Sequence, residues 1–216
     1  MKVAFITIGQ SPREDVMSEI KPYLTGIDYF EIGLLDGLSD EEIASLRAEE
    51  GELEYVTRLR DGREVKASKR KLERILERKL EKISHADLAV MLCTGEFDVA
   101  SPTPIIYPWR IMASIVKSLN PQKLGVIVPL DLQIDYARQR WSNLTEDLKI
   151  VSWSPYRGEK PRISELLDRQ LIVMDCIGYT REHEEEVRKA VEALVLRPRA
   201  ALGAFLRELN EILQRR

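Results

Sequence analysis

Runs of apolar residues along this chain predict buried strands, and the segments between them carry apolar residues at helical spacing. Residues 2–8 (KVAFITI) form a continuous apolar run rich in β-branched residues, which predicts a strand buried on both faces. Further strands are expected at 30–35, 88–93, 123–129, 148–155, 171–176 and 193–198. Strands that alternate with helices imply parallel sheets with right-handed crossovers, so the pattern predicts an α/β fold.

Capping signals indicate where the helices begin. Ser11, Pro12 and Glu14 read as an S-x-x-E capping box with proline at the first helical position, so a helix is expected from about Ser11 to Lys21. Ser39 and Glu42 form a second box, and the short helix after it is expected to reach Gly51. Other helices should begin near Ser68, Pro108, Asp131, Ser164, Thr180 and Pro198. The last of them should bury one apolar face, made of Leu202, Phe205, Leu206, Leu209 and Leu213.

One segment interrupts this alternation. Asp61 and Gly62 stand between two strand-like runs, a strong signal for a two-residue turn, so residues 55–67 should form an antiparallel hairpin. The helix that follows carries a basic run, Lys69 to Arg78, interrupted by glutamates. We interpret it as a solvated face rather than a nucleic-acid contact.

The strand and helix blocks fall into two successive sets. We therefore expect two pseudo-symmetric lobes with mainly parallel sheets flanked by helices, and a hairpin insertion in the first lobe. The first lobe should span residues 1–120 and be completed by the helix at 198–216, and the second should span 121–197. Each lobe carries one of the two cysteines of the chain, Cys93 or Cys176.

Composition narrows the classes of partner. The 216 residues carry a formal charge of −3 and are 44% hydrophobic, which disfavours nucleic acid and anionic membranes as partners and allows a sizeable core. Without an apolar run of membrane-spanning length, a cytoplasmic protein is expected. His85 and His183 have no ligand spacing around them, so we expect no metal site and no effect of chelators. The sequence leaves open whether the chain forms a homo-oligomer.

The candidate chemistry lies at the ends of two similar strands. LAVMLCTGE (88–96) and LIVMDCIGY (171–179) each deliver a cysteine to a carboxyl end, where ligands bind in open parallel sheets. A thiol has an ordinary pKa of about 8.5, which helix N-termini or nearby cations lower, so Cys93 and Cys176 are candidate bases or nucleophiles. The alternative is that both are inert core cysteines, since free cysteine is among the most buried residue types.

The loops around these cysteines supply candidate substrate-binding groups. The loop after the first strand (GQSPR) offers backbone N–H groups and an arginine to an anion, and backbone N–H groups follow each cysteine. The full set is Gly9, Gln10, Ser11, Arg13, Thr94, Gly95, Pro129, Ile177, Gly178 and Tyr179. Arg13 could clamp a carboxylate or be solvated. Glu96 and Asp98 could cap the loop or act as an acid and base, and we favour caps.

Several motifs together resemble one protein family. TIGQSPR near the start, the Asp-Gly hairpin before a basic helix, VIVP at 126–129 and MDCIGY at 174–179 resemble the AroM family across essentially the whole chain. Two lobes with a cysteine each also resemble the aspartate/glutamate/hydantoin racemase superfamily. The resemblance implies a cofactor-independent isomerase, racemase or lyase acting on a small carboxylic acid in a cleft between the lobes.

In such a racemase, Cys93 and Cys176 would remove and return an α-proton from opposite faces, with their sulfurs roughly 7 to 10 Å apart. The second motif lacks the histidine that follows the second cysteine in amino-acid racemases. A decarboxylase or cis–trans isomerase that uses one cysteine therefore stays open. So does a non-catalytic protein that binds or senses a small carboxylate.

Overall fold

The computed structural model describes residues 1–158 and 163–214, and the chain divides into two compact units. Unit 1 comprises Met1–Pro108 and Gly203–Arg216, and unit 2 comprises Trp109–Leu202. The boundaries expected from the sequence lie at residues 120 and 197. The structure instead assigns almost all of helix α4 (Pro108–Leu119) and the first turn of helix α7 (Pro198–Gln214) to unit 2.

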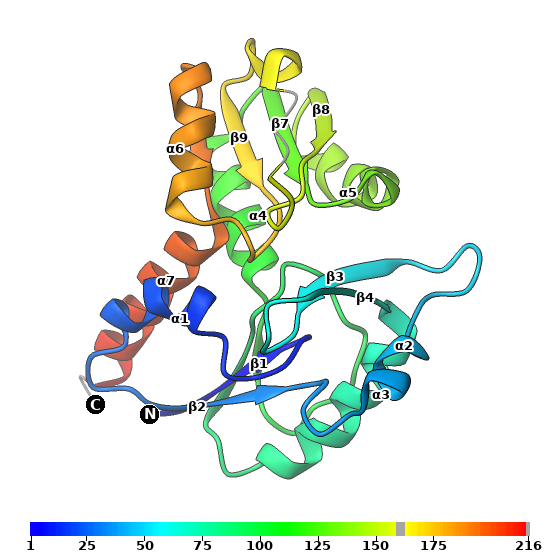
Figure 1. The fold of residues 1–216 in the computed structure, drawn as a ribbon. Helices are drawn as coiled ribbons and strands as arrows, with labels where there is room; N and C mark the ends of the chain where they lie inside the picture. Colours follow the sequence, from blue (N-terminus) through cyan, green and yellow to red (C-terminus); the bar gives the residue numbers. More distant parts are fainter. Residues whose placement is uncertain (159–162, 215–216) are drawn as a thin grey trace. The chain divides into compact units, whose positions relative to one another are not determined.

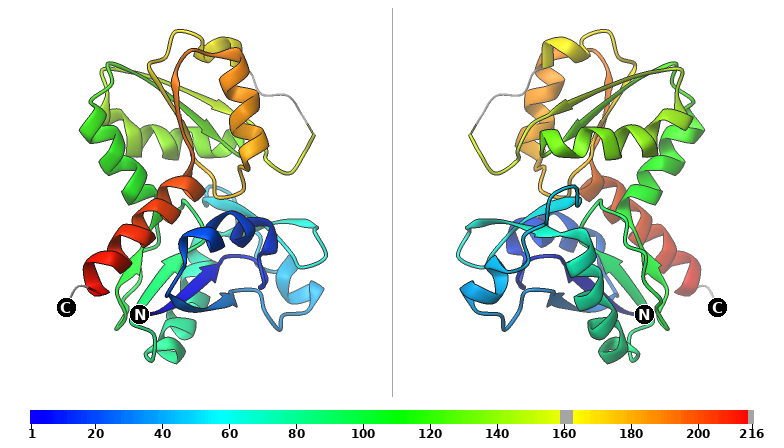
Figure 2. Two further views of the ribbon diagram at one scale, coloured as in Figure 1. Left: turned by 90° about the vertical axis from the view of Figure 1, so that its left-hand side faces the viewer. Right: turned by 90° about the vertical axis from the view of Figure 1, so that its right-hand side faces the viewer.

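Unit 1 is built on a parallel sheet of four strands in the order β2-β1-β5-β6. The strands are β1 (Lys2–Thr7), β2 (Asp28–Gly33), β5 (Leu88–Met91) and the two-residue β6 (Ile105–Ile106), which the sequence pattern did not predict. Helix α1 (Glu14–Ile20) and helix α3 (Lys69–Leu80) lie on opposite sides of this sheet (Figures 1 and 2). Short helices complete the unit: α2 (Asp40–Ala44) and the 3-10 turns η1 (Lys21–Tyr23) and η2 (Glu81–Ile83).

The hairpin prediction for unit 1 is confirmed. Strands β3 (Glu54–Arg58) and β4 (Glu64–Ser68) pair in antiparallel fashion, and Gly62 adopts a φ of 87° in the turn between them. A left-handed backbone of this kind favours glycine, which explains the Asp-Gly signal. Ser68 ends the hairpin and caps α3, because its hydroxyl accepts the backbone N–H of Lys71 at 3.4 Å.

Unit 2 repeats the topology of unit 1. Its parallel sheet has the order β10-β9-β7-β8, with β7 (Lys123–Val128), β8 (Asp147–Ser152), β9 (Leu171–Met174) and β10 (Leu194–Leu196). In both sheets the first strand lies between the second and the third, and the fourth follows the third. The expected α/β fold with two pseudo-symmetric halves is therefore confirmed, and so is the short strand before Pro198.

The two faces of the unit 2 sheet bury different helices. Helix α6 (Arg181–Ala190) and the 3-10 turn η5 (Ile163–Leu166) cover one face, in a cluster that includes Cys176. Helices α4 and α5 (Ile134–Trp141) cover the other. Figures 1 and 2 show α5 and α6 on opposite sides of the strands. Further 3-10 turns, η3 (Asp131–Gln133) and η4 (Ser142–Leu144), flank α5. Neighbouring residues of β7 enter opposite clusters, as expected for a strand buried on both faces.

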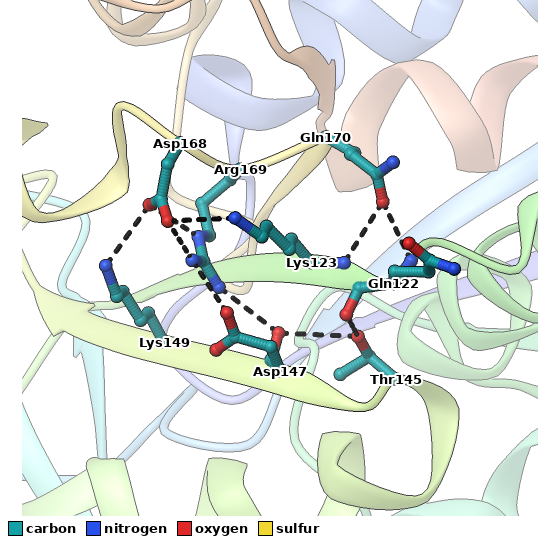
Figure 3. A network of polar contacts seen from close by, with 8 residues as sticks. All are labelled: Gln122, Lys123, Thr145, Asp147, Lys149, Asp168, Arg169 and Gln170. Carbon is teal, nitrogen blue, oxygen red and sulfur yellow. Dashed lines mark hydrogen bonds and ion pairs between the residues drawn. The ribbon is translucent and has the colours of Figure 1, made fainter.

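Polar contacts hold the amino end of the unit 2 sheet (Figure 3). The buried guanidinium of Arg169 pairs with Asp147 at 2.9 Å and with Asp168 at 2.5 Å. Hydrogen bonds from Arg169 and then Lys149 lower the pKa of Asp168. Gln170 accepts the backbone N–H groups of residues 122 and 123 at 2.8 and 3.1 Å. These contacts fix the amino end, whereas the cysteine-bearing loop leaves the carboxyl end.

Three local predictions were wrong. The helix expected from Ser11 begins at Glu14, because the Ser11 hydroxyl donates to Asp36 instead of capping. The helix after Ser39 ends at Ala44 rather than Gly51, although its capping box with Glu42 is confirmed. In α7, Leu202 and Leu206 are buried while Phe205 and Leu213 are exposed, so the inward face is narrower than predicted.

Candidate active-site cysteines

Each sheet has one point where the strand order reverses, between β1 and β5 in unit 1 and between β7 and β9 in unit 2. Loops that leave the carboxyl ends of two such strands diverge, and ligands of open α/β sheets bind in the crevice that results. Cys93 lies two residues after β5, and Cys176 lies two residues after β9. Both cysteines therefore stand at the switch point of their own unit.

The backbone enters the two cysteine loops in the same way. Leu92, just before Cys93, donates its backbone N–H to the carbonyl of Ile6 in β1 at 2.7 Å. Asp175, just before Cys176, donates to the carbonyl of Ile127 in β7 at 2.8 Å. The backbone is thus hydrogen-bonded to the sheet of its own unit as far as the residue before each cysteine.

Both sulfurs accept a hydrogen bond from the glycine two residues later. The N–H of Gly95 lies 3.2 Å from Cys93 Sγ, and the N–H of Gly178 lies 3.4 Å from Cys176 Sγ. Cys93 is 8% exposed and Cys176 is 6% exposed. A donor aimed at sulfur favours the thiolate over the thiol, whereas burial opposes the charged form. Both cysteines therefore share a Cys-x-Gly turn in which a backbone N–H faces the sulfur.

A tyrosine packs against each of these glycines. A Cβ on Gly95 would lie 2.5 Å from Cζ of Tyr55, and a Cβ on Gly178 would lie 2.5 Å from the hydroxyl oxygen of Tyr156. No side chain fits at such distances without displacing the ring. The close approach explains why glycine occupies the third position of both Cys-x-Gly turns.

The sequence reading missed two arginines of low solvent exposure that support the Cys176 loop. Arg140 of α5 forms an ion pair with Asp175, and its guanidinium lies over the rings of Trp109 and Tyr136, at 5.1 and 4.8 Å from their centroids. The indole N–H of Trp141 donates to Asp175 at 2.8 Å.

The second arginine, Arg199, donates to the carbonyls of Ile177 and Gly178 at 2.7 and 3.0 Å. The sequence positions of Arg140 and Arg199 carry no motif, because only the tertiary fold brings them to the loop.

Comparison with known proteins assigns the family. The sequence profile described as AroM protein matches residues 3–210. The chain belongs to the AroM family. No curated protein sequence matches it.

The fold of this AroM protein is that of racemases. Allantoin racemase from Klebsiella pneumoniae matches with a TM-score of 0.65 at 11% identity, covering 98% of this chain and 88% of the other. Glutamate racemase from Aquifex pyrophilus matches with a TM-score of 0.62 at 14% identity, covering 97% and 84%. An arylmalonate decarboxylase matches with a TM-score of 0.56 at 11% identity, covering 96% and 92%.

In the AroM protein, the loop after β1 is tied to the hairpin. Gln10 accepts the backbone N–H of Arg60 at 2.9 Å, and the Arg60 guanidinium donates to the carbonyl of Ser11 at 2.8 Å. A Cβ on Gly9 would lie 2.2 Å from the carbonyl oxygen of Arg58, so glycine is required there too. The side chains of Gln10 and Ser11 thus already bind protein groups. The backbone N–H groups of residues 9, 10, 11 and 13 do so as well, and Pro12 has none, so an anion at this loop would have to displace these contacts.

Arg13 matches neither alternative considered for it. The residue is only 3% exposed, so it is not solvated. Its guanidinium forms two hydrogen bonds of 2.7 Å with the carboxylate of Asp15 and one of 3.2 Å with the hydroxyl of Thr7. An internal carboxylate therefore occupies the fork that a substrate carboxylate would need.

The remaining candidates lie in or beside the protein core. Tyr179 is completely buried, and its hydroxyl donates to the carbonyl of Trp153 at 2.5 Å. Burial, followed by Cys176 and Asp175, raises the pKa of Tyr179 well above its ordinary value, so it stays a neutral donor. The sequence reading placed it in the substrate site, and the structure corrects its side chain to a packing role. Thr94, Pro129 and Ile177 are buried as well.

Glu96 and Asp98 are fixed through their backbone. The hydroxyl of Tyr55 donates to the carbonyl of Glu96 at 3.3 Å, and the N–H of Asp98 donates to the carboxylate of Glu73 at 2.7 Å. These contacts hold the loop that follows Cys93.

Neither histidine of the AroM protein belongs to a metal cluster. Within residues 1–158 and 163–214, no group of three or more His, Cys, Asp or Glu residues could hold a metal ion. His183 instead caps α6, because its Nδ1 accepts the backbone N–H of Thr180 at 3.1 Å. Burial, and then the charge of Arg199, lower the pKa of His183. Among the described helices, none is both long and apolar enough to cross a membrane.

Two surface hollows lie away from the cysteines. One, of about 430 Å³, is lined by residues that precede β7 and β8, including Pro121 and Glu146, and so lies at the amino end of the unit 2 sheet. The other, of about 650 Å³, lies between α2 and α3 and includes Leu46 and Ile75. Neither of these two hollows coincides with a switch point.

Proposed function

We propose that this AroM protein is a cofactor-independent enzyme that acts on a small carboxylic acid through the thiols of Cys93 and Cys176. The observation that supports the proposal most is the matched placement of the two cysteines. Each lies at a switch point, and each sulfur accepts the N–H of a glycine two residues later. The fold shared with racemases and a decarboxylase agrees with this chemistry.

In the racemase form of the proposal, one thiolate removes the proton next to the carboxylate. The carbon–hydrogen bond breaks, a sulfur–hydrogen bond forms, and the electron pair moves into the carboxylate to give an enediolate. The other thiol then donates its proton to the opposite face of the carbon and becomes the thiolate. Backbone N–H groups in the loops after Cys93 and Cys176 would stabilise the negative charge on the oxygens.

In the decarboxylase form, a carbon–carbon bond breaks instead. A malonate-like substrate would lose carbon dioxide, its electron pair would enter the remaining carboxylate, and a single thiol would protonate the carbon. Only one cysteine is then needed. The decarboxylase among the structural neighbours keeps this form open.

The second candidate is a binding protein without turnover. It is supported by the low exposure of both cysteines and by the internal pairing of Arg13 with Asp15, which leaves fewer groups for catalysis and substrate. Such a protein would bind a small carboxylate through backbone N–H groups.

One experiment separates the two candidates. The protein is incubated in deuterated water with amino acids, hydroxy acids and malonates, and proton NMR follows exchange of the α-hydrogen and product formation. The variant with both Cys93→Ser and Cys176→Ala is the control. Exchange or product that disappears in the control supports an enzyme. A rise in melting temperature with one of these acids, without exchange or product, supports the binding protein.

A further inference from the structure

Arg199 is a buried cation that contacts the loop after Cys176. It is the second residue of α7, belongs to unit 2 and is only 1% exposed. Its Nε donates to the carbonyl of Ile177 at 2.7 Å, and its Nη2 donates to the carbonyl of Gly178 at 3.0 Å. An arginine is always charged, and burial of a charge is costly unless hydrogen bonds compensate it. Both of these carbonyls lie within two residues of the cysteine.

The peptide unit between Ile177 and Gly178 connects this cation to the sulfur. In a planar trans peptide the carbonyl and the N–H point in opposite directions. The carbonyl of Ile177 faces Arg199, and the N–H of Gly178 faces Cys176 Sγ at 3.4 Å. A cation on the oxygen draws electron density toward it and makes the N–H a stronger donor, since linked hydrogen bonds polarise one another.

From this chain of contacts we infer that Arg199 is a positioning residue that fixes and polarises the Ile177–Gly178 peptide and thereby stabilises the thiolate of Cys176. The inference rests on the proposed function in that the thiolate is taken to be the working form.

Other charged and titratable groups surround the same loop. Asp175 precedes the cysteine and is paired with Arg140 of α5. Tyr156 packs against Gly178 from the segment after β8, and Tyr179 and His183 approach from the loop and from α6. Arg199 also acts on these neighbours, because its charge contributes, after burial, to the lowered pKa of His183. Within this set, Arg199 is the cation bonded to the peptide that contacts the sulfur.

The test measures thiolate formation directly and needs no substrate. Cys93→Ser leaves Cys176 as the single cysteine of the chain, and the variant with both cysteines replaced is the optical blank. The thiolate absorbance of Cys176 is titrated against pH in this background, with and without Arg199→Gln. We expect the substitution to raise the pH midpoint by about one unit, which is a tenfold loss of thiolate below the midpoint.

Arg197→Gln is the matched control. Arg197 lies two residues away and is buried, but its Nε pairs with Glu184 at 2.9 Å rather than with the cysteine loop. We expect Arg197→Gln to have the same thiolate midpoint as the Cys93→Ser background. An unchanged midpoint in Arg199→Gln overturns the inference, and so does an equal rise in both variants, which would indicate a general effect of charge.

Arg199→Lys covers the case in which Arg199→Gln does not fold. Lysine keeps the charge but cannot hold both carbonyls with a planar fork, so the midpoint should rise by less than in Arg199→Gln. If a folded Arg199→Lys variant has the same thiolate midpoint as the Cys93→Ser background, the positioning role is overturned. Failure of the proposed function would give a different result. Arg199→Gln would still raise the pH midpoint of the Cys176 thiolate, but no acid would show exchange of its α-hydrogen or form a product.

Discussion

The backbone N–H of Gly178 lies 3.4 Å from the sulfur of Cys176, at a position where no larger residue fits. A Cβ on Gly178 would lie 2.5 Å from the Tyr156 hydroxyl and 2.8 Å from Cγ of Pro155. We expect Gly178→Ala to lower the free energy of unfolding by about 1–3 kcal/mol through overpacking. Urea unfolding measures this loss.

Gly158→Ala is the control for this substitution, because no atom of the described residues lies within 4 Å of a Cβ there. It should leave the unfolding midpoint unchanged. Equal stabilities of the two variants would contradict the close packing of Tyr156 on the cysteine loop.

The ion pair of Arg140 with Asp175 supports the same loop from the other side. Both side chains are nearly buried, at 9% and 2% exposure. Removal of one partner leaves the other charge buried, so Arg140→Met should cost about 3–5 kcal/mol of unfolding free energy. The exposed pair of Arg181 with Glu185 is the reference, and Arg181→Ala should cost no more than about 1 kcal/mol. Chemical denaturation of both variants tests the difference, and a similar small cost for the two would show that the buried pair does not stabilise the loop.

His183 should make stability depend on pH in the weakly acidic range. Burial and Arg199 lower the pKa of His183 in the folded protein, so the unfolded chain takes up the proton first as pH falls. The contribution of His183 to the unfolding free energy is complete above the ordinary histidine pKa of about 6.5. It is lost as pH falls from that value toward the pKa of His183 in the folded protein. Unfolding free energies at pH 8, 7, 6 and 5 should therefore decrease toward acid.

Substitution of His183 by glutamine isolates this effect. Glutamine at the third helical position can accept the Thr180 N–H in a capping box, so His183→Gln should keep the cap and lose the slope between pH 7 and 5. His85→Gln, at the exposed second histidine, should retain it. A slope that persists in His183→Gln would assign the pH dependence to other groups.

The two cysteines should differ in importance once a substrate is known. In a racemase, Cys93→Ser should impair α-hydrogen exchange from one enantiomer while sparing the other, because the two bases serve opposite faces. In a decarboxylase or cis–trans isomerase, Cys176→Ala should abolish turnover while Cys93→Ser keeps much of it. Exchange in deuterated water and product formation distinguish these outcomes. A fully active Cys176→Ala variant beside an inactive Cys93→Ser variant would reverse the ranking of the two cysteines.

Local patterns in the sequence were enough to predict the strands that precede the cysteines and the hairpin at Asp61-Gly62. These features depend on β-branched apolar runs and on a turn that needs glycine, which act over a few residues. The N-terminus of α1 was mispredicted because a distant group intervened. Asp36 accepts both the hydroxyl and the backbone N–H of Ser11, so the apparent capping box does not form.

The support of the cysteine loops could not be predicted in this way. Arg199 contacts Ile177, and Arg140 contacts Asp175, although the partners are far apart in the sequence. No sequence motif links either arginine to its partner. The position of Arg13 in the loop after β1 suggested an anion-binding role, but its guanidinium pairs with Asp15, two residues later. A buried arginine at a loop can be found only when the packing that removes it from solvent is known.

Helix α7 has a consequence for how the protein is made. The division between the units falls inside it, after Leu202, so its later residues complete unit 1. Gly203 packs against the ring of Tyr23, and Asn210 donates to the carbonyl of Thr25 at 3.2 Å. During translation these contacts form only after all of unit 2 has been synthesised. The part of the chain that leaves the ribosome first is therefore expected to finish folding last, against the usual order in which N-terminal domains fold first.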